Sequence, residues 1–240
     1  MKRIWIVVIL VGLLLAGFTG VQAQVARLQA IHNMADPQLD TVDVYISLPP
    51  FGQLAKLEDV PFRTATPFVD ALAGVLLAIG IAPANSATVN DTLKNFNVTL
   101  VDGRTYVGVV NGVLDPNQFV PNPNGRDISL GFVLNDNARE TSTVPGEVQF
   151  FLVHGATDLP TVDVEIRGGA LLVDNITYGD FSPYVSLTPA NYILDIKDAM
   201  TGNLVRAYQV DLSALADSAL TFVLSGFLDP GANQNGAPLA

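Results

Sequence analysis

The chain has 240 residues, no cysteine, and 23 acidic against 12 basic residues, so its formal net charge at pH 7 is −11. The lack of cysteine excludes a disulfide framework, a thiol enzyme and a cysteine-linked lipid anchor. The acidic balance disfavours nucleic acid as a partner, because phosphate contacts depend on Lys and Arg. Hydrophobic residues make up 49% of the chain and charged residues 15%, which excludes disorder as its main state.

Residues 1–23 predict a secretory signal peptide. Lys2 and Arg3 precede an apolar run from Ile4 to Leu15, and small residues place cleavage between Ala23 and Gln24. The competing interpretation is an uncleaved anchor helix, but a spanning helix needs about 20 apolar residues. We therefore expect a secreted, extracellular or cell-envelope protein of bacterial type with no membrane span in its mature form. Its mature net charge is near −13, because both basic residues of the leader are lost.

The mature chain contains one unit twice. The tetrapeptide Thr-Val-Asp-Val occurs at 41–44 and again at 161–164, each time about ten residues after one of the two histidines. Two further pairs of similar segments follow in the same order, at 62–74 with 178–190 and at 107–116 with 220–230. A common spacing of 114 to 120 residues between the members of each pair indicates a tandem repeat. The predicted organisation is a first repeat over 24–140, a linker over 141–146 and a second repeat over 147–240.

Each repeat shows the two-residue apolar period of half-buried β-strands. In the segment 41–46, Val42, Val44 and Ile46 are expected to face one way, and Asp43 and Tyr45 the other. Short strands separated by Pro, Gly, Asn and Asp turns predict an all-β fold of two tandem immunoglobulin-like antiparallel β-sandwiches. The segment 75–82 could also be helical, but its partner in the second repeat is a clear strand, so we predict a strand. The predicted strands, in chain order, are 26–31, 41–46, 75–82, 97–100, 105–110, 128–134, 148–153, 162–166, 192–197, 204–212 and 220–224.

These segments resemble the DUF4397 family of secreted domains of unknown function. The resemblance lies in a strand that ends in histidine, a turn that ends in aspartate, and a Val-Asp-Val strand, here His32 to Asp36 before Val42 and His154 to Asp158 before Val162. It spans nearly the whole mature chain as two copies. It implies an exported β-sandwich module of microbial surface proteins and carries no activity, cofactor or catalytic residue.

The weak metal candidates are His32, Asp36, His154 and Asp158, which occupy equivalent places in the two repeats. One imidazole with carboxylates could bind a divalent cation if the groups converged. The favoured interpretation is structural: each histidine holds the turn that follows it, and each aspartate caps backbone amides. The loop from Asn122 to Asp127 also has two interpretations, a calcium-binding loop or a plain Asn-Gly turn, and the turn is favoured.

Motifs of catalysis are absent from the sequence. It contains no G-x-S-x-G, HExxH, P-loop or GxGxxG pattern, so we expect no enzyme activity and no cofactor. The expected function is a structural or adhesive module whose partner could be a cell-surface or matrix polymer or protein. The alternative is a ligand-binding module for carbohydrate, with exposed Tyr45, Tyr178 or Tyr184 as stacking platforms, and a hydrolase is the less favoured third class.

The second repeat is expected to lack its last strand. The first repeat continues from Asn122 into the strand predicted at 128–134, whereas aligning the two repeats places Leu239, next to the last residue, opposite Ile128. The favoured reason is that the sequence is a fragment of a longer product. The other is that a strand from another chain fills the gap.

Overall fold

The computed structural model describes residues 24–240, and the expected signal peptide lies outside them. About half of the chain is in β-strands, and the described part has no α-helix. The expected all-β fold is therefore confirmed. Within these residues, no helix is long and apolar enough to cross a membrane. The short 3-10 turns are Pro37–Leu39, Val89–Asp91, Pro116–Gln118 and Pro230–Ala232.

The first half forms two sheets. The one we call outer sheet 1 has the order β3-β2-β6-β7, and the one we call inner sheet 1 has the order β4-β1-β8-β9, with β5 also paired to β1. The strands are β1 (Val25–Asn33), β2 (Thr41–Leu48), β3 (Gly52–Pro61), β4 (Thr64–Ala65), β5 (Val69–Leu72), β6 (Leu76–Pro83), β7 (Lys94–Thr99), β8 (Thr105–Asn111) and β9 (Gly131–Asn135).

The second half repeats this plan with fewer strands. Inner sheet 2 has the order β13-β10-β16, and outer sheet 2 has the order β12-β11-β14-β15. The strands are β10 (Val148–His154), β11 (Val162–Ile166), β12 (Leu171–Ile176), β13 (Val185–Leu187), β14 (Asn191–Asp198), β15 (Leu204–Asp211) and β16 (Ala219–Leu224).

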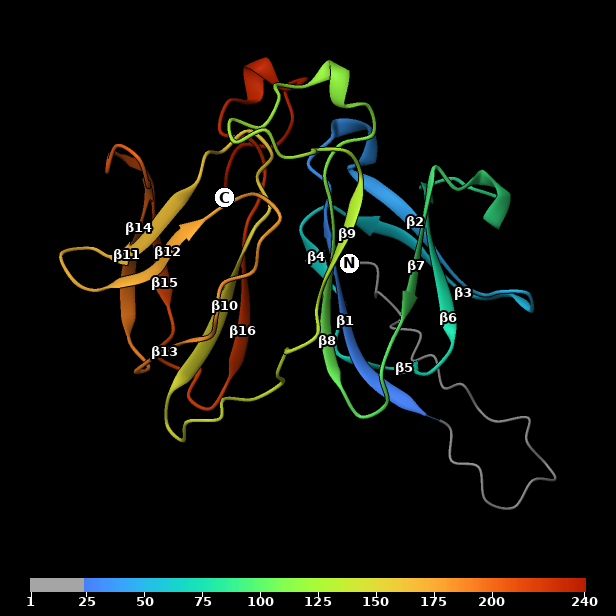
Figure 1. Ribbon diagram of the computed structural model, residues 1–240, viewed down its shortest axis with the longest axis horizontal. Helices are drawn as coiled ribbons and strands as arrows, with labels where there is room; N and C mark the ends of the chain where they lie inside the picture. Colours follow the sequence, from blue (N-terminus) through green and yellow to red (C-terminus); the bar gives the residue numbers. More distant parts are fainter. Residues whose placement is uncertain (1–23) are drawn as a thin grey trace, which may run out of the picture.

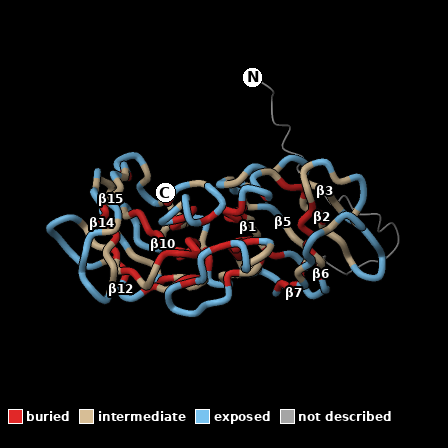
Figure 2. The backbone as a smooth tube through the Cα atoms, turned by 90° about the horizontal axis from the view of Figure 1, so that it is seen from above, coloured by how far each residue is buried: buried red, intermediate tan, exposed pale blue. Residues whose placement is uncertain are grey.

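The four sheets are stacked along the long axis in the order outer 1, inner 1, inner 2, outer 2 (Figure 1). Each half buries a core between its own two sheets, and a third core, here called the central core, lies between the two inner sheets. Seen from above, buried backbone runs through the middle of the molecule across both halves (Figure 2). The central core contains Ile31, Val107, Val109, Ala138, Phe151 and Val153.

The inner strands are apolar on both faces because both faces are covered. On β8, Tyr106 and Val110 point into the first sandwich core, while Val107 and Val109 point into the central core. On β10, Leu152 belongs to the second sandwich core, and Phe151 and Val153 belong to the central core. A strand buried on both faces is a near-continuous apolar run instead of an alternating one.

The expectation of purely antiparallel sheets is wrong for two strand pairs. β1 runs parallel to β8 from Arg27 opposite Thr105 to Asn33 opposite Asn111, and β10 runs parallel to β16 in the same manner. The physical reason is the route of the chain, which crosses to the outer sheet and back twice. It returns first as β4 and β5, antiparallel to β1, and then as β8 in the original direction. The remaining pairs between the strands are antiparallel. The immunoglobulin-like detail stays a prediction.

Sequence patterns located most strands and missed five. The ambiguous segment is a strand, β6, which pairs with β2 and β7. The missed strands are β3, β4, β5, β12 and β13, which are short or lie at sheet edges with many exposed positions. Edge strands are solvated on more sides, so their residues show no clean apolar alternation.

The ends of the two repeats correspond closely. Val113 bridges Ser129 in the first half, and Phe227 bridges Pro238 in the second. Leu239 is therefore equivalent to Leu130, two residues beyond the Ile128 that sequence alignment indicated. Both leucines are buried in the core of their own sandwich.

Candidate functional site

The first histidine turn is held together by its own side chains. The buried His32 ring at the end of β1 lies 2.8 Å through Nε2 from the carbonyl oxygen of Leu39, and its Nδ1 accepts from the N–H of Met34 at 3.2 Å. These two contacts fix the tautomer, because the nitrogen that accepts from an N–H leaves the other nitrogen as the donor. The side chain thereby joins β1 to the start of β2.

Asp36, in the same turn, connects it to a distant loop. One carboxylate oxygen accepts from the N–H of Gln38 at 2.9 Å, and the other accepts from the N–H of Leu114 at 2.9 Å. Leu114 begins the Leu-Asp-Pro segment that both repeats contain. The carboxylate therefore caps the turn and ties it to the loop after β8.

The second repeat uses equivalent residues but distributes the contacts differently, with fewer at the histidine and more at the aspartate. His154 Nε2 lies 2.9 Å from the carbonyl oxygen of Pro160. Asp158 accepts from the N–H of Leu228 at 2.7 Å, from the N–H of Asp229 at 2.9 Å and from the side-chain amide of Asn233 at 2.8 Å. Equivalent residues thus make equivalent loop-locking contacts in both halves.

Burial keeps both imidazoles neutral. Loss of solvation lowers the pKa of His32 to about 4 and also lowers that of His154, although carbonyl contacts oppose the shift. In residues 24–240, no three His, Asp or Glu side chains come together as metal ligands. The side-chain hydrogen bonds of His32 and Asp36 are all to backbone groups. Those of Asp158 are also to backbone groups, apart from the one with Asn233. We therefore propose that all four weak metal candidates have a structural role.

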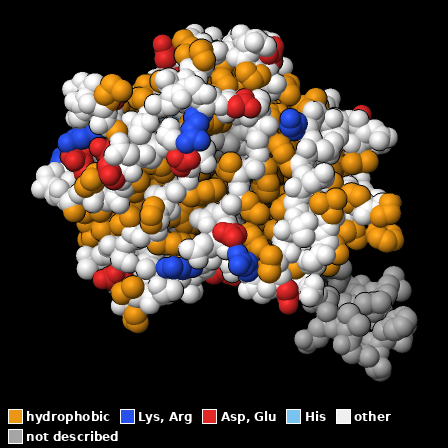
Figure 3. All heavy atoms as spheres, in the orientation of Figure 1, with side chains coloured by type: hydrophobic (Ala, Val, Ile, Leu, Met, Phe, Trp, Pro, Cys, Tyr) orange, Lys and Arg blue, Asp and Glu red, His pale blue; other side chains and the backbone are white. Residues whose placement is uncertain are grey.

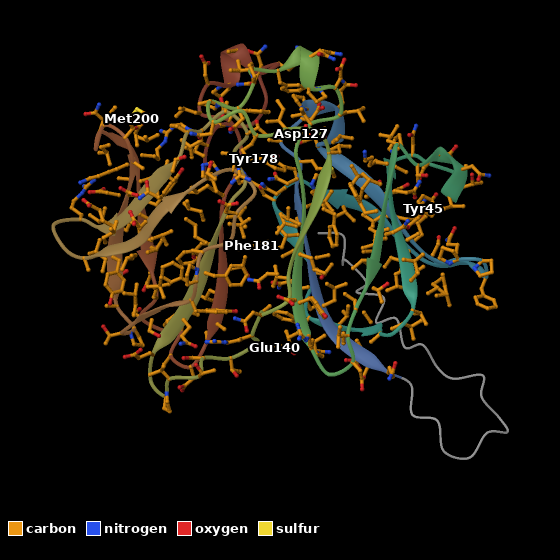
Figure 4. The ribbon with its side chains drawn as sticks, in the orientation of Figure 1. Tyr45, Asp127, Glu140, Tyr178, Phe181 and Met200 are labelled. Carbon is orange, nitrogen blue, oxygen red and sulfur yellow. The ribbon has the colours of Figure 1, made fainter. Side chains whose placement is uncertain are left out.

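The loop from Asn122 to Asp127 forms a turn, and its polar groups point to different partners. Gly125 donates its N–H to the carbonyl of Asn122, and Gly125 has a φ of +71°, which glycine adopts without strain. The side chain of Asn122 donates to the carbonyl of Thr157 at 2.8 Å, so the loop is fastened to the second half. The Asp127 carboxylate accepts from the N–H and hydroxyl of Ser129, both at 2.8 Å. Figure 4 shows Asp127 near the top of the molecule, where the loops of the two halves meet.

The tyrosines expected to be exposed are largely covered, which corrects that prediction. Tyr45 is 1% exposed and Tyr178 is 5% exposed. The half-buried Tyr184 packs edge-on against Phe151 at 5.2 Å, and the Arg139 guanidinium lies over its other side at 4.3 Å. These rings are therefore not available as a row of sugar-stacking platforms.

Sequence analysis missed the part played by the aspartate of the repeated tetrapeptide. Asp43 accepts from the N–H of Asp59 at 3.0 Å, and Asp163 accepts from the N–H of Asn175 at 2.7 Å. Asp59 and Asn175 have φ values of 52° and 53° and lie where the pairing with the neighbouring strand slips in register. The exact repetition of the tetrapeptide could have indicated this, because each aspartate holds an equivalent β-bulge in place.

Asp43 has additional partners that its counterpart lacks. Its carboxylate accepts from the hydroxyl of Ser86 at 2.6 Å and lies 3.0 Å from Lys56 Nζ, and Ser86 contacts the Tyr45 hydroxyl at 2.9 Å. Burial by itself would raise the pKa of Asp43, but these hydrogen bonds and the Lys56 charge lower it below the ordinary value. The network explains why Asp43 and Tyr45 are buried on a face expected to meet solvent.

Fold and contacts together define an all-β module of two stacked sandwiches, whose repeated His and Asp side chains hold loops and bulges. Residues 148–235 match the family described as "Domain of unknown function (DUF4397)". The expected resemblance is thus confirmed over the second half, and a second copy of the family over the first half stays a prediction. No curated protein matches the chain.

Several solved structures show remote similarity. The Bacillus anthracis TIE protein is 12% identical with a TM-score of 0.25, and the match covers 84% of this chain and 34% of that one. A family 41 carbohydrate-binding module structure from streptococcal virulence factors is 11% identical with a TM-score of 0.25, covering 87% and 99%. A candidate adhesin from Bacteroides ovatus is 12% identical with a TM-score of 0.23, covering 84% and 87%. The chain spans about a third of the length of the first, and similarity at this level carries no argument about function.

Proposed function

We propose that the protein is an exported, non-catalytic module of the cell envelope or extracellular matrix, built from two tandem copies of one β-sandwich domain. The proposal rests on one observation, which is the set of contacts that the repeated polar residues make. The His and Asp side chains that could have formed a reactive or metal-binding site instead hold loops and bulges of the same fold, twice over.

The hairpin tips at the two ends of the stack are the candidate contact surfaces. The β2–β3 hairpin carries Phe51, which is 83% exposed, and the β14–β15 hairpin carries Met200, which is 92% exposed. Met200 lies at the end of the molecule opposite the β2–β3 hairpin (Figures 1 and 4). Figure 3 shows apolar side chains gathered at the end formed by outer sheet 1. Exposed apolar residues at two ends suit a module that bridges two partners.

The experiment has a localisation arm and a binding arm. In bacteria that express residues 1–240, we expect a processed protein that begins at Gln24 outside the cytoplasm. Residues 24–240 should bind cell-envelope or matrix material without altering it, and Phe51→Ser with Met200→Ser should weaken that binding. The matched control is Thr201→Ser, at the same tip as Met200 but polar in both forms. Full-length protein retained in the cytoplasm, or release of product from the bound polymer, would contradict the proposal.

Carbohydrate binding remains the alternative function. A glycan array with residues 24–240 distinguishes it, since saturable binding to a defined glycan that survives the Phe51→Ser and Met200→Ser changes would favour the alternative.

A further inference from the structure

A pocket opens at the side of the second sandwich, between the edges of its two sheets. β12 is an edge strand of outer sheet 2, and residues 180–185 run along the edge of inner sheet 2, where Phe181 bridges Val153 and β13 pairs with β10. The pocket between these two edges has a volume of about 400 Å³, which is enough for a bound side chain with its flanking backbone. Figure 3 shows apolar side chains gathered over β10, β12 and β13.

Most of the pocket lining is apolar. Val173 and Ile176 are buried members of the second sandwich core, and Leu172, Phe181 and Val185 are partly buried. A ligand with a hydrocarbon part therefore removes apolar surface from water when it binds here, which favours binding.

The charged residues of the lining are two aspartates. Asp180 is paired with Arg126 at 3.3 Å. Asp174 is exposed, its Oδ1 accepts from the side-chain amide of Asn175 at 2.7 Å, and no lysine or arginine within residues 24–240 forms an ion pair with it. The pocket therefore carries a carboxylate without a cationic partner, which is complementary to a positively charged group on a ligand.

The first half has a lysine at the corresponding place. Glu58 and Asp174 each come directly before the bulge residue of their own repeat. Glu58 is paired with Lys56, two residues earlier, at 3.1 Å. The residue two positions before Asp174 is Leu172. The second half thus keeps the carboxylate and has an apolar side chain where the first half has the lysine.

We propose that this pocket binds a lysine side chain of a partner polypeptide. The ammonium group lies beside Asp174 as Lys56 lies beside Glu58, and the hydrocarbon stem packs on the apolar lining. Lysine suits the site better than arginine, because the Asn175 amide already occupies one oxygen of Asp174 and a guanidinium pairs best with two. Lysine also suits the site better than an amino sugar, since an amino sugar has no hydrocarbon stem.

The test uses residues 24–240 and a blocked pentapeptide that has one lysine between alanines. We expect saturable binding, with amide chemical-shift changes confined to residues 172–176 and 180–185. A peptide with norleucine in place of lysine keeps most of the stem but has no ammonium group, so it should bind at least tenfold more weakly. An arginine peptide should bind at least threefold more weakly. High ionic strength should weaken binding of the lysine peptide at least threefold, because salt screens the ion pair.

Protein variants test the assignment of the ammonium to Asp174. Asp174→Asn should weaken binding of the lysine peptide at least fivefold and leave the melting temperature unchanged, because the residue is exposed. Asp136→Asn removes the same charge from the first half and should keep binding. Leu172→Lys supplies the lysine from within the chain, as in the first half, and should abolish binding, whereas Leu172→Met should keep it.

Equal binding of the lysine and norleucine peptides, or unchanged binding by Asp174→Asn, would overturn the proposal. Tighter binding of glucosamine than of the lysine peptide at the same residues would also overturn it, since the pocket would then be a site for an amino sugar. The lining does not include Phe51 or Met200 of the hairpin tips, so failure of this test leaves the proposed function standing.

Discussion

At the scale of single residues, Asp36 and Asp158 both cap backbone N–H groups, although they differ in the number of hydrogen bonds. Both are buried. Asp36 accepts from backbone N–H groups of two separate loops, at Gln38 and Leu114, whereas Asp158 accepts from two consecutive N–H groups of one loop, at Leu228 and Asp229. Asp158 has a further donor in the buried amide of Asn233, which in turn accepts from the N–H of Val120. The carboxylate therefore sits in a chain of contacts that reaches the first half.

Asp158→Asn is expected to destabilise the protein strongly. An amide keeps one acceptor oxygen and places an NH2 group where the other oxygen was, facing groups that are donors themselves. Either the N–H of Leu228, or the N–H of Asp229 together with the Asn233 amide, then loses its acceptor, at a cost of about 1 to 3 kcal/mol. Urea unfolding at pH 7 measures the change. Asp174→Asn, in an exposed position of β12, is the control and should change the free energy of unfolding by less than about 0.5 kcal/mol.

Because of its two buried histidines, we expect the protein to lose folding stability in mild acid. The pKa of His32 in the folded protein is about 4, below the unfolded value of about 6.5. The unfolded chain therefore takes up the proton first, so the stabilisation is complete above pH 6.5 and is lost as the pH falls towards 4. For His32 the loss amounts to roughly 3 kcal/mol, and His154 adds to it in the same direction.

Urea unfolding at intervals between pH 7 and pH 4.5 checks this dependence, since most carboxylates titrate below that window. His32→Gln and His154→Gln should each flatten the slope, and the double variant should remove most of it. A slope that is unchanged in the double variant would assign the pH dependence to other groups.

At the scale of elements, matched β-bulges link the two repeats. Asp43 on β2 and Asp163 on β11 each accept from a residue of the adjacent strand whose backbone is left-handed. The bulge lets β3 and β12 slip in register against β2 and β11. Asn suits position 175, because asparagine tolerates the left-handed region better than other residues with a side chain.

Asn175→Val is expected to cost about 1 to 2 kcal/mol, since a β-branched residue is strained at a φ of 53°. Asn175→Gly should be close to neutral because glycine reaches this conformation freely. Thermal unfolding of both variants makes the comparison. Asp174→Val, one residue earlier in the same strand and outside the left-handed region, should leave the melting temperature nearly unchanged.

At the scale of the whole molecule, the central core makes one body of two repeats. It lies between the inner sheets, and Phe181 projects there in the view of Figure 4. Polar contacts between the halves reinforce it: the Asn33 amide donates to the Gly155 carbonyl, and the Asn122 amide donates to the Thr157 carbonyl at 2.8 Å. The proposed linker over 141–146 is also fastened, since Gly146 donates to the Asp217 carboxylate.

Phe151→Ala is expected to destabilise the whole protein by about 3 to 5 kcal/mol, although Phe151 lies outside both sandwich cores. Because the central core joins the halves, unfolding should remain a single cooperative transition, which calorimetry measures. Phe51→Ala removes an equal ring from an exposed hairpin tip and should have little effect. Two separate transitions, with only the second half affected, would show that the repeats unfold independently.

The sequence by itself determined the all-β class and most strand positions, and it predicts the tandem repeat. The reason is local: a two-residue apolar period, as in Val42, Val44 and Ile46, together with Pro and Gly turns, specifies strands without knowledge of distant residues. The capping of the Gln38 N–H by Asp36 was also predictable, because aspartate in such turns accepts from nearby backbone amides. The donors to Asp158, at Leu228 and Asp229, are distant in sequence and were not predictable in this way.

Only the tertiary structure decided which surfaces meet. The apolar run of β10 requires cover on both faces, but nothing local says that Val153 packs in a core shared with the first half. The burial of Tyr45 depends on Lys56 and Ser86, which come from other parts of the chain.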